Sequence, residues 1–159
     1  KEALANQCIL LPGAEEFCRT LAPEAELYIL TNGITMIQTR RFERSSIREF
    51  IKGLFISEQV GTPKPNKEFF DAVFASVPDF DKSKAVMIGD SLSSDIRGGI
   101  NAGITTIWYN PHLKRNDLGV CPDYTATSYE QVLRILHSET GRVPPHVSVL
   151  AKHNANKPG

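Results

Sequence analysis

The sequence lacks a net charge, a long apolar run and a cysteine framework. Its 18 basic and 18 acidic side chains balance, which argues against a nucleic-acid-binding protein held by bulk positive charge. No apolar run approaches the roughly 20 residues that cross a bilayer. There are only three cysteines and no CxxC pair, so neither a disulfide scaffold nor a zinc site is indicated. We therefore expect a cytoplasmic protein that binds neither nucleic acid nor membrane.

Short apolar runs alternate with amphipathic segments along the 159 residues. The predicted strands span residues 27–30, 54–56, 84–89, 104–109 and 124–126. The predicted helices span residues 13–22, 35–45, 67–76, 93–102 and 129–137. This alternation predicts an α/β fold with a mainly parallel sheet.

Three polar residues follow the predicted strands at points where chemistry is expected. Thr31 and Asp90 each come directly after a buried strand, and Lys64 lies in a loop after a third strand. The carboxyl ends of parallel strands meet at one edge of a sheet, where open α/β proteins bind their ligands. We therefore expect these three side chains to converge there.

The segment Gly89-Asp90-Ser91-Leu92-Ser93-Ser94-Asp95 contains two carboxylates at the start of a predicted helix. Carboxylate oxygens are the ligands that Mg²⁺ prefers, so Asp90 and Asp95 are candidate metal ligands. A second interpretation applies to Asp95, because a carboxylate in the first turn of a helix also stabilises the helix dipole.

The tripeptide Thr31-Asn32-Gly33 and the residue Lys64 are candidate phosphate ligands. A hydroxyl and successive backbone N–H groups in a tight turn can hold phosphate oxygens, and a lysine between two prolines can act as a point charge against phosphate. Alone, each signal is weak, because Asn-Gly is a common turn and loop lysines are usually solvated.

Taken together, the order and spacing of these residues resemble the haloacid dehalogenase (HAD) superfamily of aspartyl-phosphate hydrolases. Thr31 matches the second motif of that family, Lys64 the third, and Asp90 with Asp95 the fourth. The resemblance runs from about residue 9 to residue 137. The stretches SEQVGTPKPNKEFF and IGDSLSSDIRGGINAG look especially like the pyrimidine 5′-nucleotidases that act on non-standard nucleotides.

The resemblance implies a three-layer Rossmann-like core and a Mg²⁺-dependent phosphatase for nucleoside 5′-monophosphates. By position, Thr31 would bind phosphate through its hydroxyl, with backbone contacts from Asn32 and Gly33. Lys64 would neutralise charge on the nucleophile and the phosphoryl oxygens. Asp90 would ligate Mg²⁺, and Asp95 would support the metal or orient Lys64.

The first motif of the family, DxDx(T/V) after the central strand, is absent. Asp79-Phe80-Asp81 matches the DxD pattern, but no apolar strand precedes it. We therefore expect the C-terminal part of a longer protein, with the nucleophile upstream or on an N-terminal fragment. Residues 1–8 would be the stub of a helical cap, 9–138 a core without its central strand, and 139–159 a loosely ordered tail.

Two other hypotheses remain open at this point. A natural short form could bind a phosphorylated ligand or partner without catalysis, because the chain as given has no nucleophile. A receiver-like signalling domain also has acidic strand ends and a lysine. It fits less well, because the Pro-Lys-Pro loop has no place in that pattern.

Overall fold

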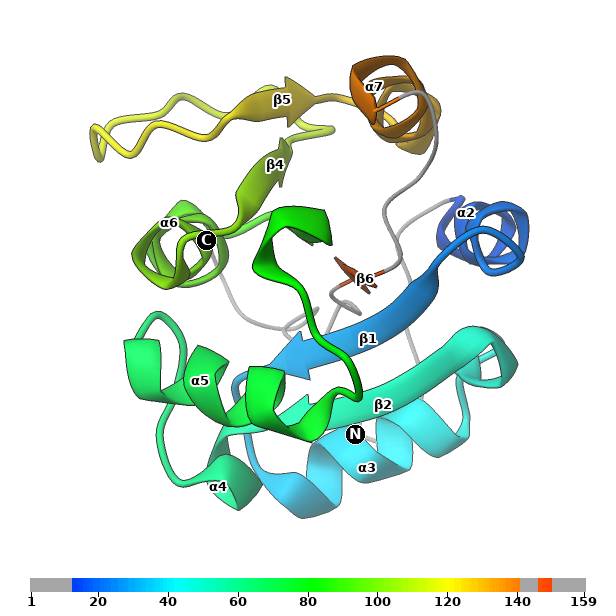
Figure 1. The fold of residues 1–159 in the computed structure, drawn as a ribbon, viewed down its shortest axis with the longest axis vertical. Helices are drawn as coiled ribbons and strands as arrows, with labels where there is room; N and C mark the ends of the chain where they lie inside the picture. The colour runs from blue at the N-terminus through cyan, green and yellow to red at the C-terminus, as the bar shows by residue number, and fades with distance from the viewer. Residues whose placement is uncertain (1–12, 141–145, 150–159) are drawn as a thin grey trace.

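A parallel sheet of six strands, in the order β2-β1-β6-β3-β4-β5, forms the centre of the fold (Figure 1). The computed structural model describes residues 13–140 and 146–149. Every pair of neighbouring strands is parallel. The strands are β1 (Glu26–Thr31), β2 (Ile51–Ile56), β3 (Ala85–Gly89), β4 (Thr105–Tyr109), β5 (Tyr124–Ala126) and β6 (His146–Val149). The α/β class with a parallel sheet is therefore confirmed.

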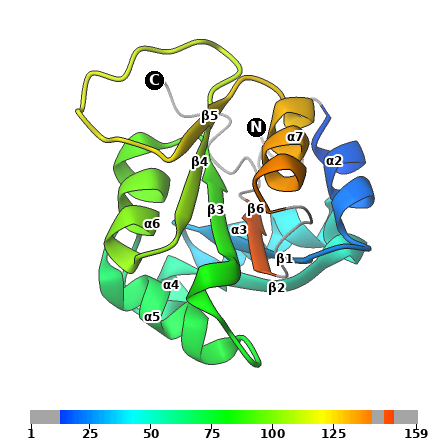
Figure 2. The ribbon, with the colours of Figure 1, turned by 45° about the horizontal axis from the view of Figure 1, so that its top comes forward.

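Helices cover both faces of the sheet and give the three layers that the family resemblance implies (Figures 1 and 2). The helices α2 and α7 lie on one face, and α5 and α6 lie on the other (Figures 1 and 2). The described helices are α2 (Ala14–Leu21), α3 (Thr35–Glu43), α4 (Ser57–Val60), α5 (Lys67–Ser76), α6 (Arg97–Ala102) and α7 (Tyr129–Thr140). Three short turns complete the set: η1 (Arg48–Phe50), η2 (Lys82–Lys84) and the π-helical η3 (Leu92–Ile96).

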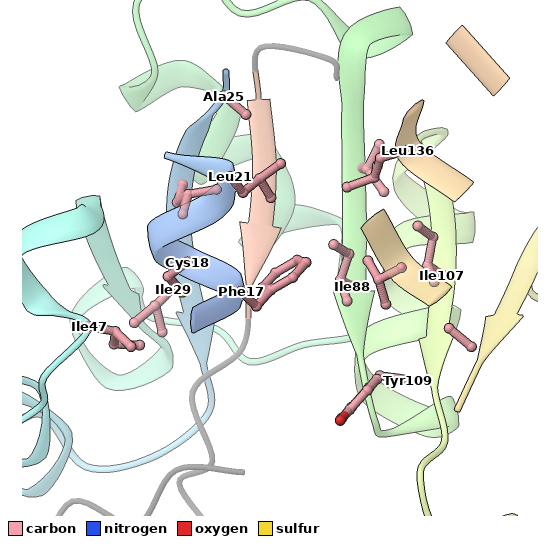
Figure 3. Packing of buried hydrophobic residues seen from close by; sticks show 14 residues of the cluster. Phe17, Cys18, Leu21, Ala25, Ile29, Ile47, Ile88, Ile107, Tyr109 and Leu136 are labelled. Atoms are coloured by element: carbon pink, nitrogen blue, oxygen red, sulfur yellow. The ribbon is translucent and has the colours of Figure 1, made fainter. Parts of the chain in front are cut away.

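The central strands are apolar because both of their faces are covered. All five residues of β3 are buried, as are all but the first residue of β1. On the α2 and α7 side, Phe17 and Leu136 reach toward Ile88 of the sheet (Figure 3). On the other side, α5 buries Phe69 and Phe70. Each fully buried large apolar side chain contributes about 1.5–3 kcal/mol, so the core holds the strand ends in a fixed arrangement.

The helix expected over residues 93–102 is split in two. Its first part is η3, because the N–H groups of Asp95 and Ile96 both donate to the Ser91 carbonyl, at 3.0 and 3.1 Å. The bond from Ile96 spans five residues, which is the hydrogen-bond pattern of a π-helix. Regular α-helix follows only from Arg97. Apolar periodicity does not reveal such a widened turn.

The centre of the sheet differs from the sequence-based expectation of a missing strand. Strand β6 lies between β1 and β3, with Val147 in register with Leu27 on one side and Val86 on the other. Residues 146–149 of the tail, expected to be loosely ordered, are therefore part of the sheet. The physical reason is that the inner edges of β1 and β3 would otherwise lack hydrogen-bond partners. The predicted cap stub at residues 1–8 lies outside the described residues.

Proline at position 147 should disrupt this arrangement. Val147 lies between two paired neighbours, so its N–H group donates within the sheet, and proline removes that donor. We expect Val147→Pro to lower the free energy of unfolding of this chain by about 3 kcal/mol or more, measured by urea denaturation. Val147→Ala keeps the N–H group and should cost less. Equal losses in the two variants would contradict the central position of β6.

Candidate active site at the carboxyl edge of the sheet

The carboxyl ends of β1 and β3 bring the predicted residues together. Thr31 is the last residue of β1, and Asp90 follows the last residue of β3. Lys64 comes from the loop between α4 and α5. Because the strands are parallel, their carboxyl ends lie at one edge, as the sequence predicted.

A buried ion pair links two of these segments. The Lys64 Nζ lies 2.6 Å from Asp95 Oδ1, and both side chains are only 1% exposed. The same ammonium donates to the Leu30 carbonyl at 2.7 Å. Burial lowers the pKa of Lys64 below that of free lysine, while the negative charges of Asp95 and Asp90 act in the opposite direction. The lysine is therefore not a solvated loop residue.

Asp95 is held on both of its oxygens. Its Oδ2 accepts the Ser91 N–H at 3.1 Å, while Oδ1 accepts the Lys64 ammonium. The carboxyl group lies against Gly89, where a Cβ atom would overlap it. Glycine is needed at position 89 for this close approach. Of the two roles expected for Asp95, this geometry matches the orientation of Lys64.

Asp90 differs from Asp95, because its side chain is exposed at the sheet edge. Its backbone carbonyl accepts the indole N–H of Trp108 at 3.1 Å, which ties the end of β3 to β4. Its negative charge also favours the charged form of Lys64. This edge therefore carries an exposed carboxylate whose negative charge acts on the buried ammonium.

The Thr31-Asn32-Gly33 turn is tied to two other segments. Thr31 is buried, with its hydroxyl 3.2 Å from the Asn32 carbonyl. The Asn32 side chain bonds to the backbone of Lys64. The Gly33 N–H donates to Ser57 Oγ at 2.9 Å. The turn is therefore fixed by the Ser57 side chain at the start of α4 and by the Lys64 backbone in the loop that follows α4.

Sequence reasoning missed three residues that hold this site. Ser57 fixes Gly33, the Ser91 N–H holds Asp95, and Trp108 ties the Asp90 backbone. Ser91 holds Asp95 through its backbone N–H group, so its side-chain type gave no signal for this contact. Ser57 and Trp108 gave no signal either, because their roles depend on contacts between distant segments.

The described residues supply only part of a metal site. Within residues 13–140 and 146–149, no group of three His, Cys, Asp or Glu side chains could hold a metal ion. Both oxygens of Asp95 already accept hydrogen bonds, Oδ1 from the Lys64 ammonium and Oδ2 from the Ser91 N–H group. Mg²⁺ is commonly held by one or two carboxylates together with water and phosphate oxygens. The exposed Asp90 side chain is suited to be one carboxylate ligand of such an ion.

Two cysteines lie in the described part of the chain. Cys18 is buried and Cys121 is exposed, and both are free thiols. Burial raises the pKa of the Cys18 thiol to about 12, so this cysteine is an inert part of the core.

No helix in the described part of the chain has the length and apolar character needed to cross a bilayer.

Known proteins are similar to this chain over the segment that carries the site. A family model described as HAD-hydrolase-like matches residues 61–132, the segment that contains Lys64, Asp90 and Asp95. The pyrimidine 5′-nucleotidase YjjG of Escherichia coli (strain K12) is 39% identical over 134 residues, which cover 84% of this chain and 60% of that protein. The chain belongs to the HAD superfamily.

Two other proteins of known sequence or structure are also similar to this chain. The pyrimidine 5′-nucleotidase PynA of Streptococcus pneumoniae (strain ATCC BAA-255 / R6) is 44% identical, over 84% of this chain and 56% of that protein. The structure of the putative HAD-hydrolase YfnB from Bacillus subtilis, bound to magnesium, has a TM-score of 0.76 and 39% identity. It covers 79% of this chain and 55% of that one. The HAD chain therefore spans little more than half the length of these relatives.

Removal of the Lys64 ammonium should destabilise the HAD core. Lys64→Met leaves the Asp95 carboxylate buried without its cation, and breaking a buried pair in this way costs about 3–5 kcal/mol. We expect a loss of this size in the free energy of unfolding, measured by urea denaturation. The matched control is Lys67→Met, which removes the exposed pair with Asp71 and should cost less than about 1 kcal/mol. Similar losses in both variants would contradict this prediction.

Proposed function

We propose that this chain is part of a Mg²⁺-dependent phosphatase that hydrolyses nucleoside 5′-monophosphates through an aspartyl-phosphate intermediate. The nucleophilic aspartate would lie upstream of this chain. The observation that carries the proposal is the buried ammonium of Lys64 beside Thr31 and Asp90 at one edge of a parallel sheet. The names of YjjG and PynA, both pyrimidine 5′-nucleotidases, support the substrate class.

Each residue has a physical reason for its proposed role. The Thr31 hydroxyl and the backbone N–H groups of the Asn32-Gly33 turn would donate hydrogen bonds to the phosphoryl oxygens and orient them. The Lys64 ammonium would offset negative charge on the nucleophile and the phosphoryl group, and in a site shielded from water such a fixed charge acts strongly. Asp95 would keep this ammonium in position.

Asp90 would hold Mg²⁺ together with water and phosphate oxygens. The ion, when bound, would neutralise phosphoryl charge as a Lewis acid. The structure of YfnB bound to magnesium supports this choice of metal. Phosphate-monoester hydrolysis is among the slowest uncatalysed reactions, so the binding residues of this chain would not suffice without a nucleophile.

We also propose the cytoplasm as the location of the protein.

The position of β6 has a consequence for this proposal. A nucleophile beside both Thr31 and Asp90 requires a strand end between β1 and β3, which is the place that β6 occupies. In the complete protein, an upstream strand would therefore have to replace β6. The loss of stability expected for Val147→Pro in this chain would then be absent from the complete protein.

A second candidate function is supported by the sequence of β6. The central strand reads His-Val-Ser-Val and carries no carboxylate, so it cannot supply the nucleophile. This favours a short form that binds a phosphorylated ligand or partner without catalysis. Thr31, Lys64 and Asp90 could serve such binding in the same arrangement.

Phosphate release from pyrimidine mononucleotides tests the leading proposal. We expect the complete protein to release phosphate with Mg²⁺ present, to lose activity with a chelator and to regain it when Mg²⁺ is restored. Asp90→Asn should lower kcat by about 10²–10³, the effect of removing one group that stabilises transition-state charge. Asp117→Asn alters an exposed residue in a loop ion pair and is the control. Full activity in Asp90→Asn would refute the assignment of Asp90.

Beryllofluoride separates catalysis from binding, because its stable aspartyl-phosphate mimic requires a carboxylate nucleophile. We expect the complete protein to form this complex and the present chain alone not to form it, as seen by ¹⁹F NMR. Formation by the present chain would place a nucleophile within it and overturn the upstream assignment. Failure of the complete protein to form the complex would favour the binding function.

A further inference from the structure

The Asn32 side chain and the Lys64 backbone are joined by a reciprocal pair of hydrogen bonds. The Lys64 N–H donates to Asn32 Oδ1 at 2.9 Å, and Asn32 Nδ2 donates to the Lys64 carbonyl at 3.1 Å. The two residues are 32 positions apart in the chain. The side-chain amide thus pairs with Lys64 through one donor and one acceptor, as a neighbouring backbone amide would in a sheet.

The sequence around Lys64 makes this pairing important. Pro63 and Pro65 flank the lysine, and proline has no backbone N–H group. The Lys64 N–H is therefore the only backbone donor in this tripeptide, and it goes to Asn32. No strand pairing holds the tripeptide, since it lies in the loop between α4 and α5.

Both ends of the lysine are held by the carboxyl end of β1. The ammonium donates to the Leu30 carbonyl at 2.7 Å, and the backbone is held by Asn32 two residues further along. Thr31 lies between these two anchors. The spacing between the lysine charge and the Thr31 hydroxyl is therefore set by one short stretch of chain.

We propose that Asn32 is a positioning residue that fixes the Lys64 backbone and thereby places the buried ammonium against Asp95. Its relevance to phosphate chemistry depends on the proposed function, but its effect on Lys64 does not. The role differs from the backbone contact with phosphate expected from the sequence. The side-chain oxygen and the side-chain NH₂ group of Asn32 are both bonded to Lys64.

Chemical labelling of lysines tests this proposal in the present chain without any activity. The Lys64 side chain is 1% exposed, so acetic anhydride should label it slowly, whereas Lys84 is exposed and serves as the internal standard. We expect Asn32→Ala to raise the relative labelling rate of Lys64 about tenfold. A tenfold change corresponds to about 1.4 kcal/mol, a loss of the size expected when two hydrogen bonds are removed. Mass spectrometry of the peptide that contains Lys64 gives the rate.

A matched control exists within the same chain. Asn110 forms the same reciprocal pair with the backbone of Lys114, with both distances 2.9 Å. Asn110→Ala therefore removes an equivalent pair of bonds elsewhere and should leave the labelling of Lys64 unchanged. If it raises the labelling of Lys64 as much as Asn32→Ala does, the effect is general destabilisation and the proposal is wrong.

One further variant and one kinetic measurement complete the test. If Asn32→Ala does not fold, Asn32→Ser, which is too short to bridge both backbone groups, should give the same tenfold increase. In the complete protein, Asn32→Ala should lower kcat more than it raises KM, because the phosphate ligands remain. Wild-type labelling of Lys64 in a folded Asn32 variant would overturn the proposal. Absence of phosphatase activity with raised labelling would refute the proposed function alone.

Discussion

The arrangement of the site depends on one buried ion pair, between Lys64 and Asp95. Two charges in a dry interior are costly to bury unless they are paired and their remaining bonds are made. Here the ammonium also donates to the Leu30 carbonyl, and the carboxylate also accepts the Ser91 N–H. The pair therefore joins the end of β1, the loop after α4 and the π-helical turn η3, three segments far apart in the sequence.

Neighbouring residues hold both members of this pair in position. Gly89 allows the Asp95 carboxyl to lie against the end of β3, and the widened turn η3 presents Asp95 from the next segment. On the opposite side, the Asn32 side chain holds the Lys64 backbone. Asp90, in contrast, is exposed at the same edge. The two aspartates therefore differ in environment: Asp95 is buried against Lys64, and Asp90 is exposed to solvent.

The regular elements could be predicted because local pattern and core burial agree. The helix expected over residues 67–76 has the same bounds in the structure, and it buries Phe69, Phe70 and Val73. The strand expected over 84–89 begins one residue later, at Ala85. Strand β6 could not be predicted in this way, since a segment of four residues has too little pattern of its own. It forms because β1 and β3 would otherwise present unpaired inner edges, and β6 pairs with both of them.

The sequence by itself determined the α/β class, the order of the elements and the convergence of Thr31, Lys64 and Asp90 at one edge. The spacing of apolar residues and the positions of turn residues are local properties of the sequence. Parallel strands bring their carboxyl ends to one edge of the sheet regardless of how individual side chains pack. Only the tertiary structure decided which groups pair. Asp95 could have served a helix dipole or a metal, and Asn32 could have been an ordinary turn residue. Contacts between segments about 30 residues apart gave each of them Lys64 as its partner, because that is how buried polar groups satisfy their hydrogen bonds.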